Sequence, residues 1–273
     1  MSERDGFDAG VPCWVETWHN DPEAALTFYS GLFGWEAENT LGLEADGTFS
    51  ICRLRGRDVA AIGSPIPEGA PPTAVWSTFV RVESAQRTAT QVAEAGGSVM
   101  VEPFESFEGG RLAIVADPSG AVLAAWEQAE HRGAQLVNEP GAWSMSILNT
   151  RDPEGAEAFY GTVFGWETET FDTGGGEVEL FRLPGYVGGE PQQPVPRDVV
   201  AVMVEMDSHG LPKEMPPHWS VDFWIDDTDA AAAKAPELGG SVVVPPFDSP
   251  AFRQAVLLDP GGAAFTASQL RLG

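Results

Sequence analysis

The stretch FYSGLFGW at residues 28–35 decides the organisation of this chain, because it returns as FYGTVFGW at residues 159–166. The two copies start 131 positions apart, and the Asp-Pro-Glu segments before them, at 21–23 and 152–154, have the same spacing. A repeat of this length indicates two copies of one domain and excludes a solenoid of short units.

Later landmarks support the duplication and place the domain boundaries. Three of them occur once in each half, 142 or 143 positions apart: Trp76 and Trp219, the Gly-Gly pairs at 96–97 and 239–240, and the Asp-Pro turns at 117–118 and 259–260. With 273 residues, each half can bury a core of ordinary size. We expect a first domain at 1–130, a polar linker at 131–141 and a second domain at 142–273.

The composition limits the partners of the protein. There are 15 Lys and Arg residues against 41 Asp and Glu residues, and the formal net charge is −26. Phosphate-rich surfaces would be repelled, so we expect neither nucleic acid nor an anionic membrane as a partner. The acidity keeps the protein in solution, or it attracts a cationic ligand to a cleft.

Cysteine usage and the terminal sequence indicate a cytoplasmic protein. Cys13 and Cys52 have no CxxC spacing, which disfavours both a disulfide framework and a zinc site. Residues 1–10 are polar and acidic, unlike a signal peptide. No apolar run approaches the ~18 residues that a membrane-spanning helix needs.

Hydrophobic periodicity predicts a strand, a helix and further strands, twice in each half. The first unit begins with a strand at 12–19, in which Trp14, Glu16 and Trp18 share one face, and continues with a helix that starts near Asp21 and stops at Gly34. The other expected helices are 85–95, 153–163 and 228–237. The other expected strands are 48–54, 59–62, 75–82, 99–101, 111–116, 121–126, 143–149, 177–183, 199–205, 219–225, 241–244, 253–258 and 263–267.

These landmarks, taken in order, resemble the vicinal oxygen chelate superfamily, which includes glyoxalase I, extradiol dioxygenases, fosfomycin-modifying enzymes and bleomycin-binding proteins. The pattern is most similar to its tandem, two-domain bacterial branch, often labelled glyoxalase-like or hydroxylase. The resemblance implies an α+β fold with two tandem domains. Each domain would be a pair of βαβββ modules that curve into a half-barrel around a cleft.

The resemblance also implies where metal ligands would lie, on the inward faces of the strands. The corresponding positions in the two halves are Trp14 and Met145, Ser77 and Ser220, Ala124 and Thr266, and residues near Val59 and Val202. None of them is His, Glu or Cys. A divalent ion needs three or four such donors to converge, so we expect no metal and no other cofactor.

Two carboxylates are the candidate catalytic groups. Glu16 lies between Trp14 and Trp18 on its strand, where desolvation would raise its pKa and suit it to general acid or base catalysis. The alternative is that Glu16 accepts an indole N–H or bonds to a neighbouring strand. Asp222, with Trp224 two residues beyond it, makes a matching case in the second half, where the alternative is an ion pair or a rim position.

Two histidines and a set of inward-facing side chains complete the candidate site. His209 and His218 lie in the connector before Trp219, where each is a proton shuttle or an ordinary surface residue. Inward aromatic rings would stack on a flat or cationic ligand. The expected substrate-binding residues are Trp14, Trp18, Ser77, Phe79, Trp126, Met145, Ser220 and Trp224.

Three functions are compatible with these residues. The first is a metal-independent enzyme that performs isomerase, cyclase, lyase or hydratase chemistry on a small carbonyl-bearing or aromatic metabolite. The second is a non-catalytic resistance protein that sequesters a drug or antibiotic, and the third is a metal-dependent glyoxalase or dioxygenase. Each needs a small-molecule ligand. Because the chain already holds two full domains, we expect a monomer or a weak homodimer.

Overall fold

The computed structural model describes residues 3–41, 46–106, 109–172, 177–188, 196–208, 210–249 and 251–271. The elements of the first half are β1 (Pro12–Trp18), α1 (Pro22–Phe33), β2 (Glu36–Asn39), β3 (Thr48–Leu54), β4 (Arg57–Ser64), β5 (Trp76–Arg81), α2 (Ala85–Glu94), β6 (Ser98–Glu105), β7 (Gly110–Ala116) and β8 (Val122–Gln128). Those of the second half are β9 (Trp143–Thr150), α3 (Pro153–Phe164), β10 (Glu167–Asp172), β11 (Glu177–Arg182), β12 (Val199–Glu205), β13 (His218–Trp224), α4 (Thr228–Glu237), β14 (Ser241–Ser249), β15 (Phe252–Leu258) and β16 (Ala264–Leu270).

Each half forms one open sheet of eight strands from two βαβββ modules, which confirms the expected α+β architecture. The strand order is β2-β3-β4-β1-β5-β8-β7-β6 in the first sheet and β10-β11-β12-β9-β13-β16-β15-β14 in the second. The two modules of a sheet meet where β1 pairs antiparallel with β5, and β9 pairs antiparallel with β13. All four helices of the described residues begin and end within one residue of their expected positions.

Local signals explain the helix boundaries. The side chain of Asp21 caps α1 by accepting a hydrogen bond from the backbone N–H of Ala24, and Pro22 occupies the first turn. Gly34 ends the helix in the left-handed conformation, with φ of 75°. Asp152 and Gly165 cap α3 in the same way.

Two strands, β2 and β10, were not predicted from the sequence; they directly follow Trp35 and Trp166 of the repeated stretch. Each lies at an edge of its sheet, and every residue of β2 is exposed. An edge strand that buries neither face has no apolar alternation, so periodicity could not detect it. The edge strands β6 and β14 are likewise longer than expected, because their second halves contain prolines and bulges.

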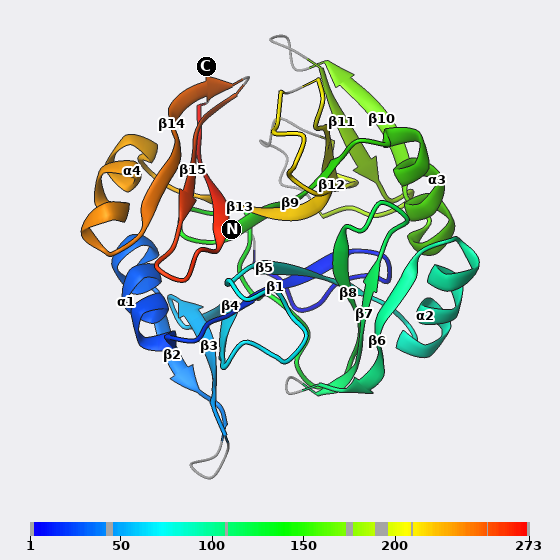
Figure 1. Ribbon diagram of the computed structural model, residues 1–273, viewed down its shortest axis with the longest axis horizontal. Coiled ribbons are helices and arrows are strands. Elements are labelled where there is room, and N and C mark those ends of the chain that lie inside the picture. Colours follow the sequence, from blue (N-terminus) through cyan, green and yellow to red (C-terminus); the bar gives the residue numbers. More distant parts are fainter. Residues whose placement is uncertain are drawn as a thin grey trace.

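The two sheets pack back to back, and their other faces point away from each other (Figure 1). At the centre of the packed side, the hydroxyls of Thr78 on β5 and Ser146 on β9 lie 2.7 Å apart and are buried. Helices α1 and α4 cover one flank, and α2 and α3 cover the opposite flank (Figure 1). Each flank therefore combines one helix from each half of the chain.

The repeated stretch forms the contacts between the halves. Tyr29 Oη donates a hydrogen bond of 2.8 Å to Oδ2 of Asp259, in the Asp-Pro turn of the second half. In the equivalent contact of the other copy, Tyr160 Oη donates to Asp117 Oδ2 in the first half at 2.9 Å. The sequence landmarks that reveal the duplication are therefore the residues that join its two copies.

Candidate functional site

Each sheet has an outward face, which points away from the other sheet and carries the residues predicted to line a cleft. In the first sheet this face is filled by its own aromatic side chains. Trp14, Phe79 and Trp126 are each no more than 1% exposed. His131 lies against two of them, with ring centroids 4.7 Å from Trp14 and 5.5 Å from Trp126. Since His131 comes from the segment expected to be a polar linker, that segment contributes a ring to the interior of the first half.

Glu16 and Trp18 lie on the same face and bond to each other. Trp18 Nε1 donates to Glu16 Oε1 at 2.8 Å, which is one of the two alternatives that the sequence left open for this carboxylate. In the strand register, Glu16 is opposite Ser77. The indole of Trp18 covers Gly63, where a Cβ atom would collide with the ring. These contacts fix Glu16 within a packed layer.

The equivalent face of the second sheet carries smaller and more polar side chains. Asp222 is opposite Met145 on β9 and Thr266 on β16. The corresponding residue in the first sheet is Phe79, opposite Trp14 and Ala124. In the same registers, Ser268 corresponds to Trp126. The three large rings of the first half are thus replaced by Met145, Asp222 and Ser268. Met145 and Thr266 on this face are only partly buried, whereas Trp14, Phe79 and Trp126 are buried.

Asp222 is a buried carboxyl group with an unusually high pKa. Its side chain belongs to a residue only 6% exposed, and burial raises its pKa from 3.8 to about 7, although the hydroxyls of Ser268 and Ser144 oppose the shift. Oδ1 of Asp222 has no hydrogen-bond partner among the described residues. At neutral pH this group is present in both its protonated and its ionised form.

A series of hydrogen-bonded side chains extends across the sheet from Asp222, beginning with Ser268. Gln254 Nε2 donates to Ser268 Oγ at 3.0 Å, and Ser249 Oγ donates to Gln254 Oε1 at 2.7 Å. These residues lie on neighbouring strands, because Gln254 pairs with Ser268 in the register of β15 and β16. The series connects the buried carboxyl group with partly exposed side chains near the end of β14.

The remaining candidates on β13 share this face, because side chains alternate along a strand. Ser220 Oγ accepts a hydrogen bond from Asn149 Nδ2 at 3.0 Å. The ring centroids of Trp224 and Phe252 are 6.3 Å apart. His218 is at the start of the strand, with Nδ1 2.9 Å from the carbonyl oxygen of Pro216. His209 falls outside the described residues.

The sequence candidates therefore form two groups and not one site. The first sheet holds Trp14, Glu16, Trp18, Ser77, Phe79 and Trp126, and the second holds Met145, His218, Ser220, Asp222 and Trp224. The two faces point away from each other (Figure 1). The two carboxylates, Glu16 and Asp222, belong to different faces and cannot act on one ligand together.

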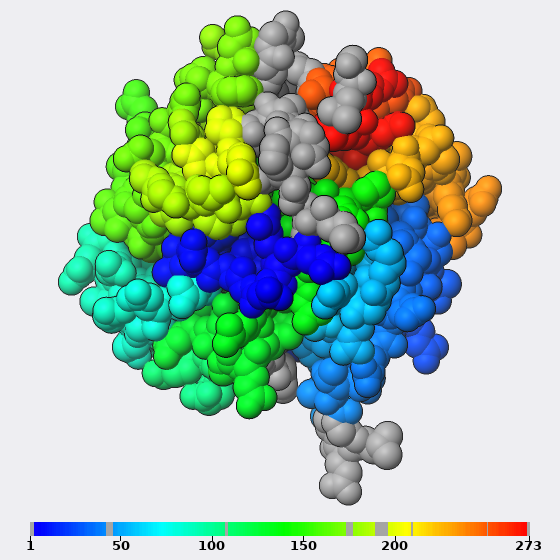
Figure 2. Space-filling view, turned by 180° about the vertical axis from the view of Figure 1, so that it is seen from behind, coloured from blue at the N-terminus to red at the C-terminus, as the bar shows by residue number. Residues whose placement is uncertain are grey.

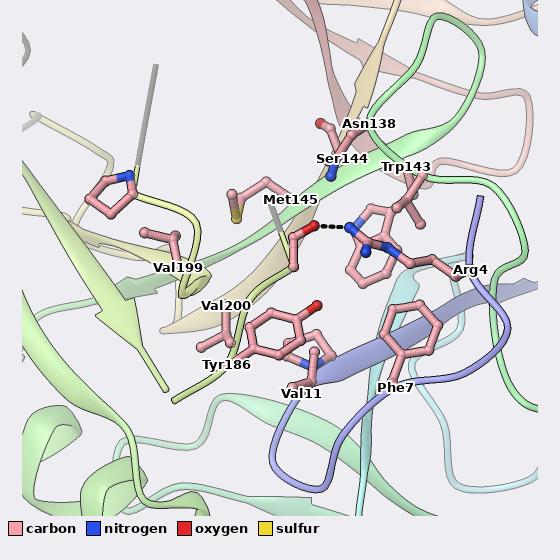
Figure 3. A pocket seen from close by; sticks show the side chains of 14 residues that line it. Arg4, Phe7, Val11, Asn138, Trp143, Ser144, Met145, Tyr186, Val199 and Val200 are labelled. Carbon is pink, nitrogen blue, oxygen red and sulfur yellow. Dashed lines mark hydrogen bonds between the residues drawn. The ribbon is translucent and has the colours of Figure 1, made fainter. Parts of the chain in front are cut away.

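A cavity of about 60 Å³ lies beside Met145, at the start of β9 (Figure 3). Its walls include Arg4, Phe7, Trp143, Ser144, Met145 and Tyr186. Among these residues, only Met145 was predicted from the sequence to bind substrate. The segment before β1 has no periodicity or motif, so the sequence offered no signal that Arg4 and Phe7 would reach the second half.

The residues at the expected metal positions do not fit a divalent ion. Register places Trp14, Ser77 and Ala124 on one face, and the same holds for Met145, Ser220 and Thr266. None of these six can supply the histidine or carboxylate donors that such an ion requires. Within the described ranges, no three His, Cys, Asp or Glu side chains converge in a way that could hold a metal.

The strand register places the fourth expected metal position, near Val59 and Val202, at Ala61 and Val202. Ala61 pairs with Glu16 and Val202 pairs with Ile147, so Val202 corresponds to Ala61. The offset between the halves is 141 positions here, because the loops before these strands differ in length. Val59, Ala61 and Val202 are all aliphatic, so the position still lacks a metal ligand.

The fold and its repeated modules define the class of the protein. The chain belongs to the glyoxalase/bleomycin resistance protein/dioxygenase superfamily, whose sequence profile matches residues 14–125. A second profile, for a glyoxalase-like domain, matches residues 145–268. No helix in the described part of the chain is long and apolar enough to cross a membrane.

Two relatives align along nearly the whole chain. The protein named "Putative glyoxylase CFP32" of Mycobacterium tuberculosis is 36% identical over 271 residues, covering 97% of each chain. The "Anthracycline biosynthesis protein DnrV" of Streptomyces peucetius is 32% identical over 279 residues, covering 98% of this chain and 96% of that protein.

Solved structures share the fold at low sequence identity. The Mn(II)-bound glyoxalase from Novosphingobium aromaticivorans has a TM-score of 0.61 and 16% identity, covering 96% of this chain and 82% of that one. The 2,3-dioxygenase LapB from Pseudomonas sp. KL28 has a TM-score of 0.57 and 13% identity, covering 96% and 93%. At these identities the likeness concerns the fold alone.

Proposed function

We propose that this protein is a glyoxalase-like enzyme that acts on a small molecule without a bound metal, with Asp222 as its general acid and base. The observation that carries the proposal is a buried carboxyl group with a pKa of about 7, on a face where the neighbouring Met145 and Thr266 are only partly buried. A catalytic acid or base works best when its pKa is near the working pH. Glu16, held by Trp18 in the packed first sheet, is assigned a structural role.

The proposed substrate is a small aromatic molecule that carries a carbonyl group. The face around Asp222 combines apolar contact surface from Met145, Trp224 and Phe252 with the hydroxyls of Ser144 and Ser268. Few polar groups among apolar walls are typical of small-molecule sites. A relative named for anthracycline biosynthesis supports a role in the metabolism of such compounds.

The proposed chemistry is proton transfer next to the carbonyl group. The Asp222 carboxylate takes a proton from the carbon beside the carbonyl, and the electron pair of that C–H bond moves toward the carbonyl oxygen. The Asp222 carboxylic acid then returns the proton to another atom of the substrate. The exchange consumes no oxidant and yields an isomer, and lyase, cyclase or hydratase chemistry would use the same acid and base.

The test uses 1-tetralone, an aromatic ketone, as a probe. We expect the protein to accelerate exchange of the protons beside its carbonyl group for deuterium in D2O, as followed by NMR. Asp222→Asn should slow this exchange about a hundredfold or more, because it removes the base. Glu16→Gln is the matched control from the first half and should retain the wild-type rate, and dialysis against EDTA should leave that rate unchanged.

Equal rates for wild type and Asp222→Asn would refute the catalytic assignment. Binding of 1-tetralone with no acceleration by the wild-type protein would instead favour sequestration without catalysis. That second candidate has its own support, since the net charge of −26 would attract a cationic drug.

A further inference from the structure

The cavity beside Met145 contains two buried hydrogen-bond donors that have no acceptor. Arg4 Nε and Trp143 Nε1 are both buried and lack a hydrogen-bond partner among the described residues. Trp143 is only 5% exposed, and both side chains line the same cavity (Figure 3). Native proteins pair nearly all such groups, so two unpaired donors on one cavity indicate a site for an acceptor.

Hydrogen bonds to two other segments of the chain fix the position of Arg4. The segment before β1 lies across the surface where the two halves meet (Figure 2). The backbone N–H of Arg4 donates to the carbonyl oxygen of Gln135 at 3.0 Å, and its Nη2 donates to the carbonyl oxygen of Gly188. A Cβ atom at Gly188 would collide with the hydroxyl of Tyr186, so glycine allows these groups to pack closely. These contacts hold the guanidinium at the cavity and leave its Nε available.

The charge of the residues that line the cavity favours an anion. Arg4 is the one charged residue among the described residues that line it, in a protein whose net charge is −26. The volume of about 60 Å³ is enough for a few water molecules or a carboxylate group, and too small for an aromatic ring. Charge-assisted bonds from a guanidinium to a carboxylate are among the strongest hydrogen bonds in proteins.

We propose that this cavity binds the carboxylate group of the ligand, with Arg4 Nε and Trp143 Nε1 donating to its oxygens. The body of the ligand then lies over Met145, which is opposite Asp222 in the strand register. Ser144 connects the two places, because it lines the cavity and its hydroxyl donates to the carbonyl oxygen of Asp222 at 3.0 Å. The inference rests on the proposed function for the position of the reacting group, and it narrows the substrate class to aromatic carboxylic acids.

The test is a titration of the full-length protein with benzoate, followed through the indole N–H signals in ¹H–¹⁵N NMR spectra. Trp143→Phe removes one signal and thereby assigns it. We expect that signal to move and saturate with benzoate in the wild-type protein. Methyl benzoate, which has no charge, should bind at least tenfold more weakly, and Arg4→Met should weaken benzoate binding by a similar factor.

Arg57→Met is the matched control for Arg4→Met, because Arg57 Nη2 bonds to the neighbouring Glu3 at 3.0 Å outside the cavity. It should leave benzoate affinity unchanged. A Trp143 signal that does not respond to benzoate, or equal affinity of wild type and Arg4→Met, would overturn the proposal.

The two proposals can fail separately. Asp222→Asn should still bind benzoate, with a Trp143 signal that moves and saturates, since Asp222 contributes no donor to the cavity. If benzoate binds as expected while 1-tetralone exchange does not depend on Asp222, the carboxylate site stands and the catalytic role falls. If 1-tetralone exchange depends on Asp222 while benzoate does not bind at the cavity, Asp222 remains the catalytic group and the carboxylate site is refuted.

Discussion

At the scale of single residues, the two halves have diverged where it matters for chemistry. Phe79 and Asp222 occupy equivalent places in the two sheets, yet one contributes to an aromatic layer and the other is an acid with a pKa of about 7. Burial is the main cause of the shift, because removal from water disfavours the ionised carboxylate. A residue in this state lowers the stability of the protein whenever it must be charged.

The pKa of Asp222 predicts how stability depends on pH. The pKa is 3.8 in the unfolded chain and about 7 in the folded one, so the folded state binds more protons between these values. The contribution of Asp222 to the free energy of unfolding should therefore be greatest below about pH 4 and should be lost as pH rises through 7. Asp222→Asn cannot ionise, and its stability relative to wild type should rise over this range by up to about 4 kcal/mol.

Urea unfolding of both proteins at pH 5 and pH 8.5 measures this difference. Asp226→Asn, at an exposed position four residues along the chain, controls for the loss of one negative charge. An advantage of Asp222→Asn that is the same at both pH values would contradict the assignment.

At the scale of elements, the Gly-Gly pairs after α2 and α4 are required by contacts between halves. A Cβ atom at Gly240 would collide with the ring of Phe28 on α1 and with the carbonyl oxygen of Leu258. At the equivalent position of the first half, a Cβ atom at Gly97 would collide with the ring of Phe159 on α3. Each pair therefore ends a helix and also provides the space into which a helix of the other half packs.

Gly240→Ala should destabilise the protein by roughly 1–3 kcal/mol, the usual cost of an extra methyl group in a packed interior. Phe28 is fully buried, and the opposing carbonyl belongs to the backbone, so neither can easily move. The midpoint of urea unfolding measures the effect, with the exposed Ser241→Ala as control. An unchanged midpoint would show that α1 does not pack tightly on this turn.

At the scale of the whole molecule, four buried hydrogen bonds in two symmetric pairs help to join the two halves in the described part of the chain. Besides the two tyrosine–aspartate pairs, Trp35 Nε1 donates to the carbonyl oxygen of Gly141 at 2.7 Å, and Trp166 Nε1 donates to that of Gly10 at 2.6 Å. All four donors are buried. Each core therefore contains side chains from both halves, and neither half keeps its contacts without the other.

The protein should accordingly unfold in one cooperative transition, although the sequence contains two domains. Far-UV circular dichroism and tryptophan fluorescence should give coincident urea curves, because separation of the halves exposes both cores at once. Tyr29→Phe should shift both curves together, since it leaves Asp259 and Trp76 Nε1 without the hydroxyl that links them. Two resolved transitions would show that the halves are independent.

Most of the fold could be predicted from the sequence, because its signals are local. Asp21 and Gly34 mark the ends of a helix through their own backbone and side-chain chemistry, and the spacing of Tyr29 and Tyr160 reveals the duplication. The edge strand β2 was missed because its exposed residues carry no alternation. Asp222 was identified as a candidate, since a carboxylate among inward-facing residues of a strand is visible in sequence.

The sequence by itself thus determined the tandem α+β architecture and the absence of metal-ligand residue types at the expected positions. Only the tertiary structure decided that Glu16 lies among fully buried rings while Asp222 lies beside partly buried side chains, and that Arg4 and Trp143 line one cavity. The physical reason is the range of the interactions concerned. Caps and periodicity depend on residues a few positions apart, whereas burial, pKa and cavity lining depend on side chains brought together from distant parts of the chain.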